Sequence, residues 1–161
     1  MADSVHGKLL AAAVTALQGA SALSAIDDAN IVQQTAPTDK SPLPALPGII
    51  LVPWGAERID SGPLRPSNVS EVIGYPILIC YLAAGNQTHS DSGLDANLLI
   101  REEIIDLFIH ARLSITATGV TVCDQTIEPI EVVNTAAWWD KNLFSSPLLL
   151  IVWCKKVRRA A

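Results

Sequence analysis

The chain has 161 residues, of which half are hydrophobic and 17% are charged, and this balance excludes an intrinsically disordered protein. The formal net charge of −5 argues against a protein dedicated to duplex DNA, which normally carries a basic face. The mean hydropathy of +0.34 is high for a small soluble monomer. We therefore expect one domain over residues 1–161, with either a large core or an apolar surface that a partner covers.

The first predicted element is a helix over residues 4–19. Its apolar side chains recur at helical spacing, and Ser4 stands where an N-cap is expected. The opening of the chain also has features of a secretory signal peptide, but Asp3 and the pair Gln18 and Gly19 interrupt that pattern. Because no apolar run approaches the ~18–20 residues that span a bilayer, we expect no membrane segment.

A Pro-rich loop or extension is predicted over residues 27–47. The tetrapeptide IVQQ, residues 31–34, is a candidate edge strand within it. Asp27 and Asp28 suit the start of a turn better than a cation site. Because long loops often carry binding residues, we take this pair as a candidate contact with a partner.

Two apolar strands follow. The first is GIILVPW, residues 48–54, and the second is GYPILICYLA, residues 74–83. The second strand is apolar on both faces, so both faces are expected to be covered. The segments 55–73 and 84–93 have the Gly, Pro, Asn and Ser content of loops.

The stretch LDANLLIREEIIDLFIHARL, residues 94–113, predicts a second helix, with Asp95 or Ser92 as its N-cap. Acidic side chains gather on one side of this helix, which we take as the solvent face. Apolar side chains form a stripe on the opposite side.

Two arginines, Arg101 and Arg112, project at the shoulder of that stripe, near Phe108. A buried guanidinium without a partner is costly. Either the two side chains extend along the stripe to water, or a carboxylate meets them. Arginine suits pairing across a subunit boundary because its planar fork binds a carboxylate through two hydrogen bonds. We take these three residues as candidates for a subunit interface.

After Gly119, two short strands are predicted over residues 120–125 and 130–134. The final strand is PLLLIVWCKKV, residues 147–157, and residues 158–161 form a C-terminal tail. Strands that adjoin in sequence, with the helices set apart, predict an α+β fold. We expect a mixed, mostly antiparallel sheet flanked by two main helices on one face.

The connection TAAWWDKN, between the last strands, carries Trp138 and Trp139. Two large indoles in a connection are either a lid on the core or anchors of an interface. The sequence leaves both alternatives open, and the pair joins the interface candidates.

The common catalytic motifs are absent: the sequence has no GxGxxG, GxxxxGK[ST], HExxH or GxSxG. His89, Ser90 and Asp91 are residue types of a hydrolytic triad, but adjacency in sequence does not provide triad geometry. We interpret His89 and Asp91 instead as loop residues that contact a partner. Three scattered cysteines without CxxC spacing predict no disulfide framework and no zinc site, and we expect Cys80 and Cys154 to be buried free thiols. We therefore predict no catalytic, cofactor-binding or metal-binding residues.

The order and spacing of the segments carry a family resemblance. A short amphipathic helix precedes a Pro-punctuated loop, followed by PGIILVPW, GYPILICY and a helix containing LLIREEIIDLF, and the chain closes with SSPLLLIVWCKKVRR. From about residue 4 to residue 158, this order resembles the tail terminator, or tail completion, proteins of long-tailed bacteriophages and related neck proteins.

The resemblance implies a sheet flanked by helices in a subunit that forms a ring, usually of six copies, on the last ring of the tail tube. Such a ring stops tube polymerisation, contacts the tail tube protein and the head connector, and catalyses no reaction. DNA passes through the hole without sequence-specific binding, and an acidic chain suits a passage in which DNA slides. The protein would need no cofactor and would reside in the virion after assembly in the host cytoplasm.

Three alternatives remain from the sequence. A head-tail adaptor on the capsid side of the neck would differ from a tail terminator in its partner. A small binding domain would use a cleft near Trp138 and Trp139 for a ligand. A hydrolase would be built on His89, Ser90 and Asp91, and an undisturbed activity after His89→Ala would exclude it.

Overall fold

The computed structural model describes residues 4–34, 44–60, 70–85, 91–134, 136–137 and 142–157. Its helical elements are α1 (Val5–Gln18), the 3₁₀ turns η1 (Ser21–Leu23) and η2 (Asp28–Asn30), and α2 (Asp91–His110). Its strands are β1 (Ile31–Gln33), β2 (Gly48–Pro53), β3 (Arg58–Asp60), β4 (Ser70–Ala84), β5 (Val120–Pro129) and β6 (Leu143–Val157). The predicted α+β class is confirmed.

The six strands form one sheet. Five of them follow the order β1-β2-β4-β6-β5, and β3 pairs with β4 farther along the edge that β2 also uses. β1 and β2 are parallel, and the other pairings among the described strands are antiparallel. β4 and β6 pair over their whole length, from Ser70 opposite Val157 to Ala84 opposite Leu143. The sheet is therefore mixed and mostly antiparallel, as predicted.

Helix α1 has the predicted N-cap. The Oγ of Ser4 accepts a hydrogen bond from the backbone N–H of Gly7 at 3.0 Å, which satisfies one free donor of the first turn. The helix ends where the N–H of Gly19 donates to the carbonyl of Thr15 at 3.0 Å. Its buried residues lie on one side and contact β1 and β2; they are Leu9, Leu10, Ala13 and Leu17.

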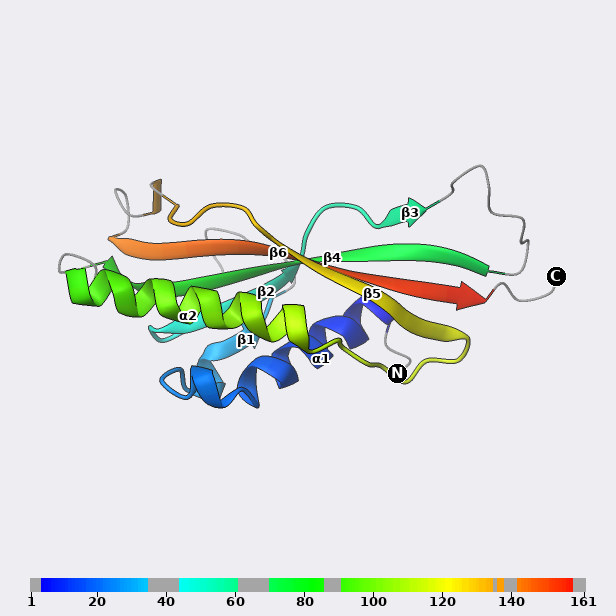
Figure 1. Ribbon diagram of the computed structural model, residues 1–161, viewed down its shortest axis with the longest axis horizontal. Helices are drawn as coiled ribbons and strands as arrows, with labels where there is room; N and C mark the ends of the chain where they lie inside the picture. Colours follow the sequence, from blue (N-terminus) through cyan, green and yellow to red (C-terminus); the bar gives the residue numbers. More distant parts are fainter. Residues whose placement is uncertain are drawn as a thin grey trace.

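Both helices lie on the same face of the twisted sheet (Figure 1), α1 against β1 and β2 and α2 against β5 and η1. Because side chains alternate along a strand, every second residue of β4 and β6 points toward the helices. These core residues are Tyr75, Ile77, Ile79, Tyr81 and Ala83 of β4 and Phe144, Leu148, Leu150, Val152 and Cys154 of β6. On the opposite face Gly74 leaves room for Trp153, because a Cβ at position 74 would lie 2.8 Å from the indole.

The strand β6 begins at Leu143 rather than at residue 147, and two further differences from the prediction concern other segments. β3 and the first residues of β4 fall within residues 55–73, which we predicted as a loop. β5 runs unbroken to Pro129, and residues 130–134 are not a strand. In both places, pairing with β4 or β6 determines which residues are in a strand. A long neighbouring strand provides backbone hydrogen bonds that cannot be recognised from the local sequence.

The boundaries of α2 also differ from the prediction. The helix begins at Asp91 rather than at residue 94, so Ser92 and Asp95 lie within its first turns and neither is the N-cap. It ends at His110, which leaves Arg112 beyond the helix. The segment after α2 is fixed by Gln125 of β5, whose side-chain amide donates to the carbonyls of Phe108 and Ala111 and accepts from the N–H of Leu113.

Candidate subunit interface

A small group of polar side chains is buried between α2 and the sheet. The hydroxyl of Tyr81 donates a 2.8 Å hydrogen bond to Oδ1 of Asn97, which is 5% exposed. Ser146 lies opposite Tyr81 in the register of β4 and β6 and is fully buried. Within the described residues, Nδ2 of Asn97 and Oγ of Ser146 have no hydrogen-bond partner. Buried polar atoms are rarely left without a hydrogen-bond partner, so these two atoms distinguish the group from the apolar core around it.

Arg101 follows Asn97 by one helical turn and therefore lies on the same side of α2. It is 9% exposed, and its Nε is buried without a hydrogen-bond partner in the part of the chain that the structure describes. No carboxylate among those residues pairs with its guanidinium. An uncompensated buried charge costs on the order of several kcal/mol, so Arg101 is the most unusual residue of the helix.

The other interface candidates occupy different environments. Arg112 is exposed and lies beyond the end of α2, so it does not project from the helical stripe as we expected. Phe108 is 1% exposed and belongs to the core of its own subunit. Trp138 and Trp139 lie outside the described residues. The structure therefore places Arg101 and Arg112 in different environments, although we had predicted the same role for both from the sequence.

The candidate partner contacts that the structure describes belong to two elements, η2 and α2. Asp27 accepts a 3.0 Å hydrogen bond from the backbone N–H of Ala29 and so caps the turn η2, which confirms that it starts a turn. Asp28 is exposed beside it. His89 lies outside the described residues, and Asp91 opens α2 rather than lying in a loop.

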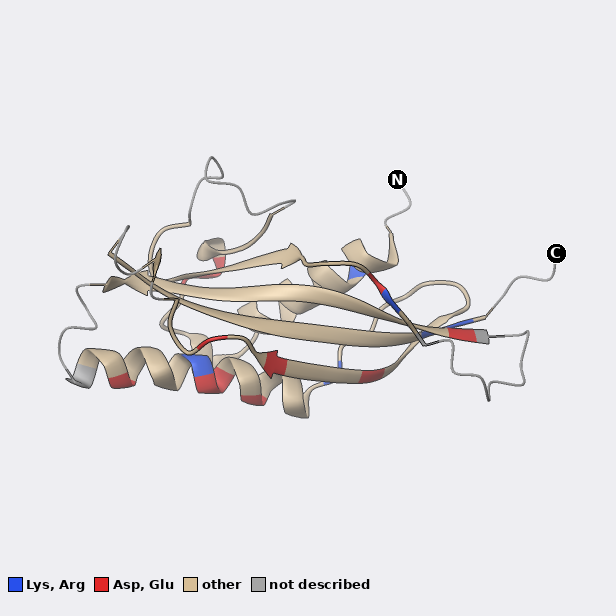
Figure 2. Cartoon of the chain, turned by 90° about the horizontal axis from the view of Figure 1, so that it is seen from above, with Lys and Arg blue, Asp and Glu red and all other residues tan. Residues whose placement is uncertain are grey.

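The exposed side of α2 combines acidic and apolar residues. Leu99 is 57% exposed and Ile109 is 60% exposed. Asp95, Glu102 and Asp106 are exposed on the same side, and Figure 2 shows acidic residues recurring along the helix. We call these five residues the α2 flank. Leu99 and Ile109 are about 15 Å apart along the helix axis, so each is a separate apolar side chain among carboxylates.

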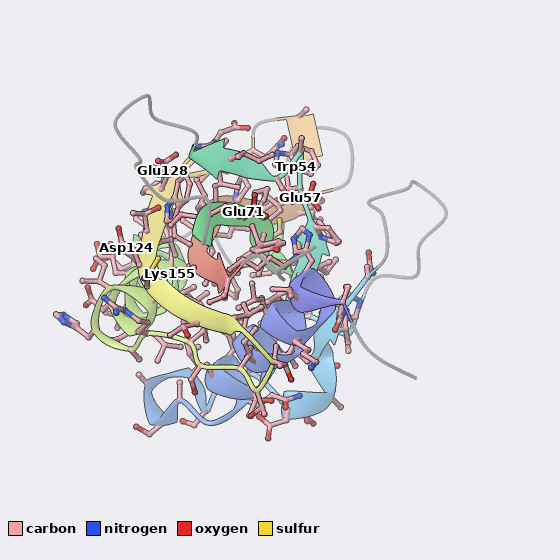
Figure 3. All side chains as sticks on the ribbon, turned by 90° about the vertical axis from the view of Figure 1, so that its right-hand side faces the viewer. Trp54, Glu57, Glu71, Asp124, Glu128 and Lys155 are labelled. Atoms are coloured by element: carbon pink, nitrogen blue, oxygen red, sulfur yellow. The ribbon has the colours of Figure 1, made fainter. Side chains whose placement is uncertain are left out.

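A second exposed apolar group lies where β3, β4 and β6 run side by side toward the C-terminus. Ile59 is 65% exposed, Val157 is 52% exposed, and Trp54 is 43% exposed. Arg58 and Lys155 are exposed in the same region, which faces the viewer in Figure 3. We call these five residues the distal end. The register places Asp60 of β3, Val72 of β4 and Lys155 of β6 in one row across the sheet, whereas Ile59 is in register with Cys154 and points to the opposite face from Val157.

A hollow of about 570 Å³ lies beside the start of α1. The ring of His6 borders it and donates from Nε2 to the carbonyl of Pro76 at 2.8 Å. Tyr75 also borders it, and burial raises the pKa of its hydroxyl, with smaller contributions from nearby Cys154, Glu57 and Glu71. The hollow contains one cation, Lys156, and one carboxylate, Glu57, so its charge selects neither an anion nor a cation.

The three cysteines are free thiols in different environments. Cys80 is half-buried, and burial raises its pKa although its Sγ lies 3.1 Å from Oγ of Ser145. Cys154 is 1% exposed, and burial, with a smaller contribution from Cys123, raises its pKa to about 11. Cys123 is exposed. The predicted burial is therefore complete for Cys154 and partial for Cys80.

The described residues contain no group of three or more His, Cys, Asp or Glu side chains arranged to hold a metal ion. Among the same residues, no helix is long and apolar enough to cross a membrane.

The buried polar residues Asn97, Tyr81 and Ser146 were not recognised in the sequence. Asn97, Arg101 and Ile104 recur at helical spacing, so Asn97 was visible as a polar residue on an otherwise apolar stripe. Tyr81 and Ser146 are far from Asn97 in sequence, and only the pairing of β4 with β6 brings them beneath it.

Comparisons with known proteins give structural likenesses to solved chains. No protein-family model and no curated protein matches the chain. A solved chain described as "Virion of native gene transfer agent (GTA) particle" aligns with a TM-score of 0.49 and 14% identity, over 97% of this chain and 98% of that one. A likeness at this level is too low to establish a common function.

Proposed function

We propose that this protein is a non-enzymatic structural subunit of a phage virion. Identical copies form a ring, of six subunits, at the head-proximal end of the tail tube. The ring ends tube polymerisation and joins the tube to the head connector, and DNA passes through it without sequence-specific binding. The chain acts as one domain over residues 1–161, assembles in the host cytoplasm and remains in the virion.

The observation that supports this proposal best is the state of Arg101. A guanidinium that is 9% exposed and has a buried Nε without a partner among the described residues is poorly satisfied by its own subunit. We take its missing partner to be a carboxylate of a neighbouring copy. A planar arginine fork binds such a carboxylate through two hydrogen bonds, which also fixes the orientation of the neighbour.

Further support comes from the surface and from the sequence. Apolar side chains are exposed on the α2 flank and at the distal end. A subunit of a ring has a neighbour on each of two sides and needs a surface for each of them. A contact between two different surfaces of identical subunits closes into a ring when the rotation per subunit allows it. The order of segments over most of the chain resembles that of tail terminator proteins.

The loops are assigned to the partners that lie above and below the ring. The exposed pair Asp27 and Asp28 at η2, with the Pro-rich extension 27–47, is assigned to one axial partner. Asp91, which opens α2, and His89, which precedes it in the sequence, are assigned to the other. The tail tube protein and the head connector are these two partners.

Native mass spectrometry of variants at position 101 tests the proposal. Arg101→Met retains the apolar stem and removes the charge, so the monomer keeps its thermal stability or gains some, while the ring is lost. Arg112→Ala removes an exposed arginine and serves as the matched control, which keeps both ring and stability. An Arg101→Met protein that assembles as well as the wild type would show that Arg101 has no role across a boundary. Equal loss of monomer stability and of assembly would assign Arg101 to folding instead.

A further inference from the structure

We infer that the buried polar group between α2 and the sheet binds one small monovalent anion, such as chloride, inside each subunit. The group consists of Asn97 and Arg101 of α2, Ser146 of β6 and Tyr81 of β4. Three of its polar atoms are buried without a hydrogen-bond partner in the part of the chain that the structure describes; they are Nδ2 of Asn97, Nε of Arg101 and Oγ of Ser146. The inference goes beyond the proposed ring and does not depend on it.

The register of the sheet brings Ser146 beneath Asn97. Ser146 lies opposite Tyr81, and Phe144 and Leu148 on either side of it along β6 both belong to the core, so Ser146 points toward the helices as they do. Tyr81 reaches α2 from the same row and donates its 2.8 Å hydrogen bond to Asn97. Figure 1 shows the first turns of α2 over the end of β4 and the start of β6, where this row lies.

Arg101 contributes a third donor and the positive charge. It follows Asn97 by four residues, so the two side chains lie on the same face of α2. Side chains of a helix lean toward its N-terminus, which directs Arg101 back toward the turn that carries Asn97. Its Nε is buried, although the residue as a whole is 9% exposed. The unpaired atoms of the group therefore come from three side chains that converge on one region of the core.

The hydrogen-bonding capacity of these atoms favours an anion over a water molecule. Nδ2 of Asn97 and Nε of Arg101 can only donate, and the hydroxyl of Ser146 can turn its proton toward the same guest. A water molecule accepts about two hydrogen bonds and brings no negative charge, so it leaves one donor and the guanidinium charge uncompensated. An anion accepts all of these hydrogen bonds and neutralises the charge. The group itself contains no carboxylate that could do so.

The surroundings of the group select a small ion with a single charge. Asn97 is 5% exposed and Ser146 is fully buried, and Ile104 and Phe108, which follow Arg101 on the same side of α2, are core residues. Apolar surroundings strengthen the attraction between a guanidinium and an anion, and they make any excess charge costly. A monovalent ion therefore balances the one charge of Arg101 without adding another.

Arg101 can serve this anion and a neighbouring subunit together. A guanidinium carries five N–H donors, of which Nε has one. An anion at the buried Nε leaves the four donors of the terminal nitrogens for a carboxylate of a neighbouring copy. The two proposals thus use different donors of one side chain, and each can fail without the other.

Replacement of chloride at constant ionic strength tests the site in the full-length chain. Urea denaturation is followed in sodium chloride and in sodium gluconate, whose monovalent anion is too bulky to enter the core. Above the dissociation constant, each tenfold rise in chloride should raise the ratio of folded to unfolded protein roughly tenfold, because the anion binds only the folded state. Gluconate should produce no such rise.

Variants at three positions assign the effect to the site. Arg101→Met removes the positive charge and keeps an apolar stem, so its stability should not depend on chloride. Ser146→Ala removes one hydroxyl and should raise the apparent dissociation constant for chloride roughly tenfold or more. Arg112→Ala, the matched control at an exposed arginine, should keep the wild-type dependence.

Diffraction from crystals of the full-length chain grown with sodium bromide locates the ion directly. Bromide replaces chloride and scatters anomalously, so an anomalous peak between Asn97, Arg101 and Ser146 is expected in the wild type. No peak is expected there in Arg101→Met.

Several results would overturn the anion site. They are a wild-type stability that is the same in chloride and in gluconate, a chloride dependence that persists in Arg101→Met, an equal loss of that dependence in Arg112→Ala, and a bromide crystal with only a water molecule beside Asn97 and Ser146. A chloride dependence that appears only in the ring would place the anion at a subunit boundary and overturn a site within the subunit. A monomeric chain with the predicted dependence would support the anion site and overturn the ring.

Discussion

The hydroxyl of Tyr81 in β4 donates a 2.8 Å hydrogen bond to Oδ1 of Asn97 in α2, one helical turn before Arg101. This bond links the middle of the sheet to the helix one turn from Arg101, whose Nε has no hydrogen-bond partner among the described residues. It fixes the rotation of α2 about its axis, because a helix that turned would separate Asn97 from Tyr81. The position of Arg101 therefore depends on a polar contact inside the core as well as on apolar packing.

Tyr81→Phe should destabilise the subunit by about 1–3 kcal/mol, because it leaves the buried amide of Asn97 without its partner. Urea denaturation of the monomeric form measures this loss. The double variant Tyr81→Phe with Asn97→Leu removes both polar groups, so it should lose less stability than Tyr81→Phe alone. A larger loss in the double variant would mean that the amide is satisfied in another way.

The free energy of unfolding should fall in alkaline solution. Burial raises the pKa of Tyr81 from its ordinary value of 10.0 to about 12, and burial with the nearby Cys123 raises the pKa of Cys154 from 9.0 to about 11. The folded state therefore holds these protons more tightly than the unfolded chain. Their contribution to stability is complete below about pH 9 and is lost as the pH rises, through about 11 for Cys154 and about 12 for Tyr81.

For Tyr81 this loss should amount to about 2 kcal/mol. Urea denaturation at several alkaline pH values measures it, and Tyr81→Phe provides the control because it has no hydroxyl to ionise. Its stability should fall less steeply than that of the wild type over the range from 10 to 12. Parallel curves for the two proteins would contradict the assignment to Tyr81.

The three thiols should react at different rates with iodoacetamide. Cys123 is exposed, whereas burial raises the pKa of Cys80 and raises that of Cys154 to about 11. Because the thiolate is the nucleophile, a shift of this size leaves Cys154 with roughly a hundredfold less reactive form at neutral pH. Peptide mapping after brief labelling should find the label on Cys123, and Cys123→Ser should remove the fast phase. Fast labelling of Cys154 in the folded protein would contradict its burial in the core.

Local sequence was sufficient for the elements that contain continuous apolar runs. The runs GIILVP and PLLLIVWC became β2 and most of β6, and the helical periodicity after Leu94 became most of α2. These segments could be predicted because burial of an apolar run or stripe is decided within the segment itself. The α+β class followed from their order along the chain.

The first residues of β4 could not be predicted in the same way. The residues Ser70 to Ile73 are polar at their start, and their strand conformation comes from pairing with Lys155 and Lys156 of β6. Asn97 was equally hidden, because its partner Tyr81 is 16 residues away and meets it only after the sheet has formed. Long-range pairing thus decided both the extent of the sheet and the environment of Arg101.

The most direct test of whether identical copies assemble into a ring is native mass spectrometry of the wild-type chain at high concentration. A binding assay on isolated tail tubes accompanies it. We predict a closed assembly of six 17.1 kDa subunits that binds the tube end and prevents further addition of tube protein. A species that remains at 17.1 kDa at every concentration and leaves tube growth unchanged would contradict the ring.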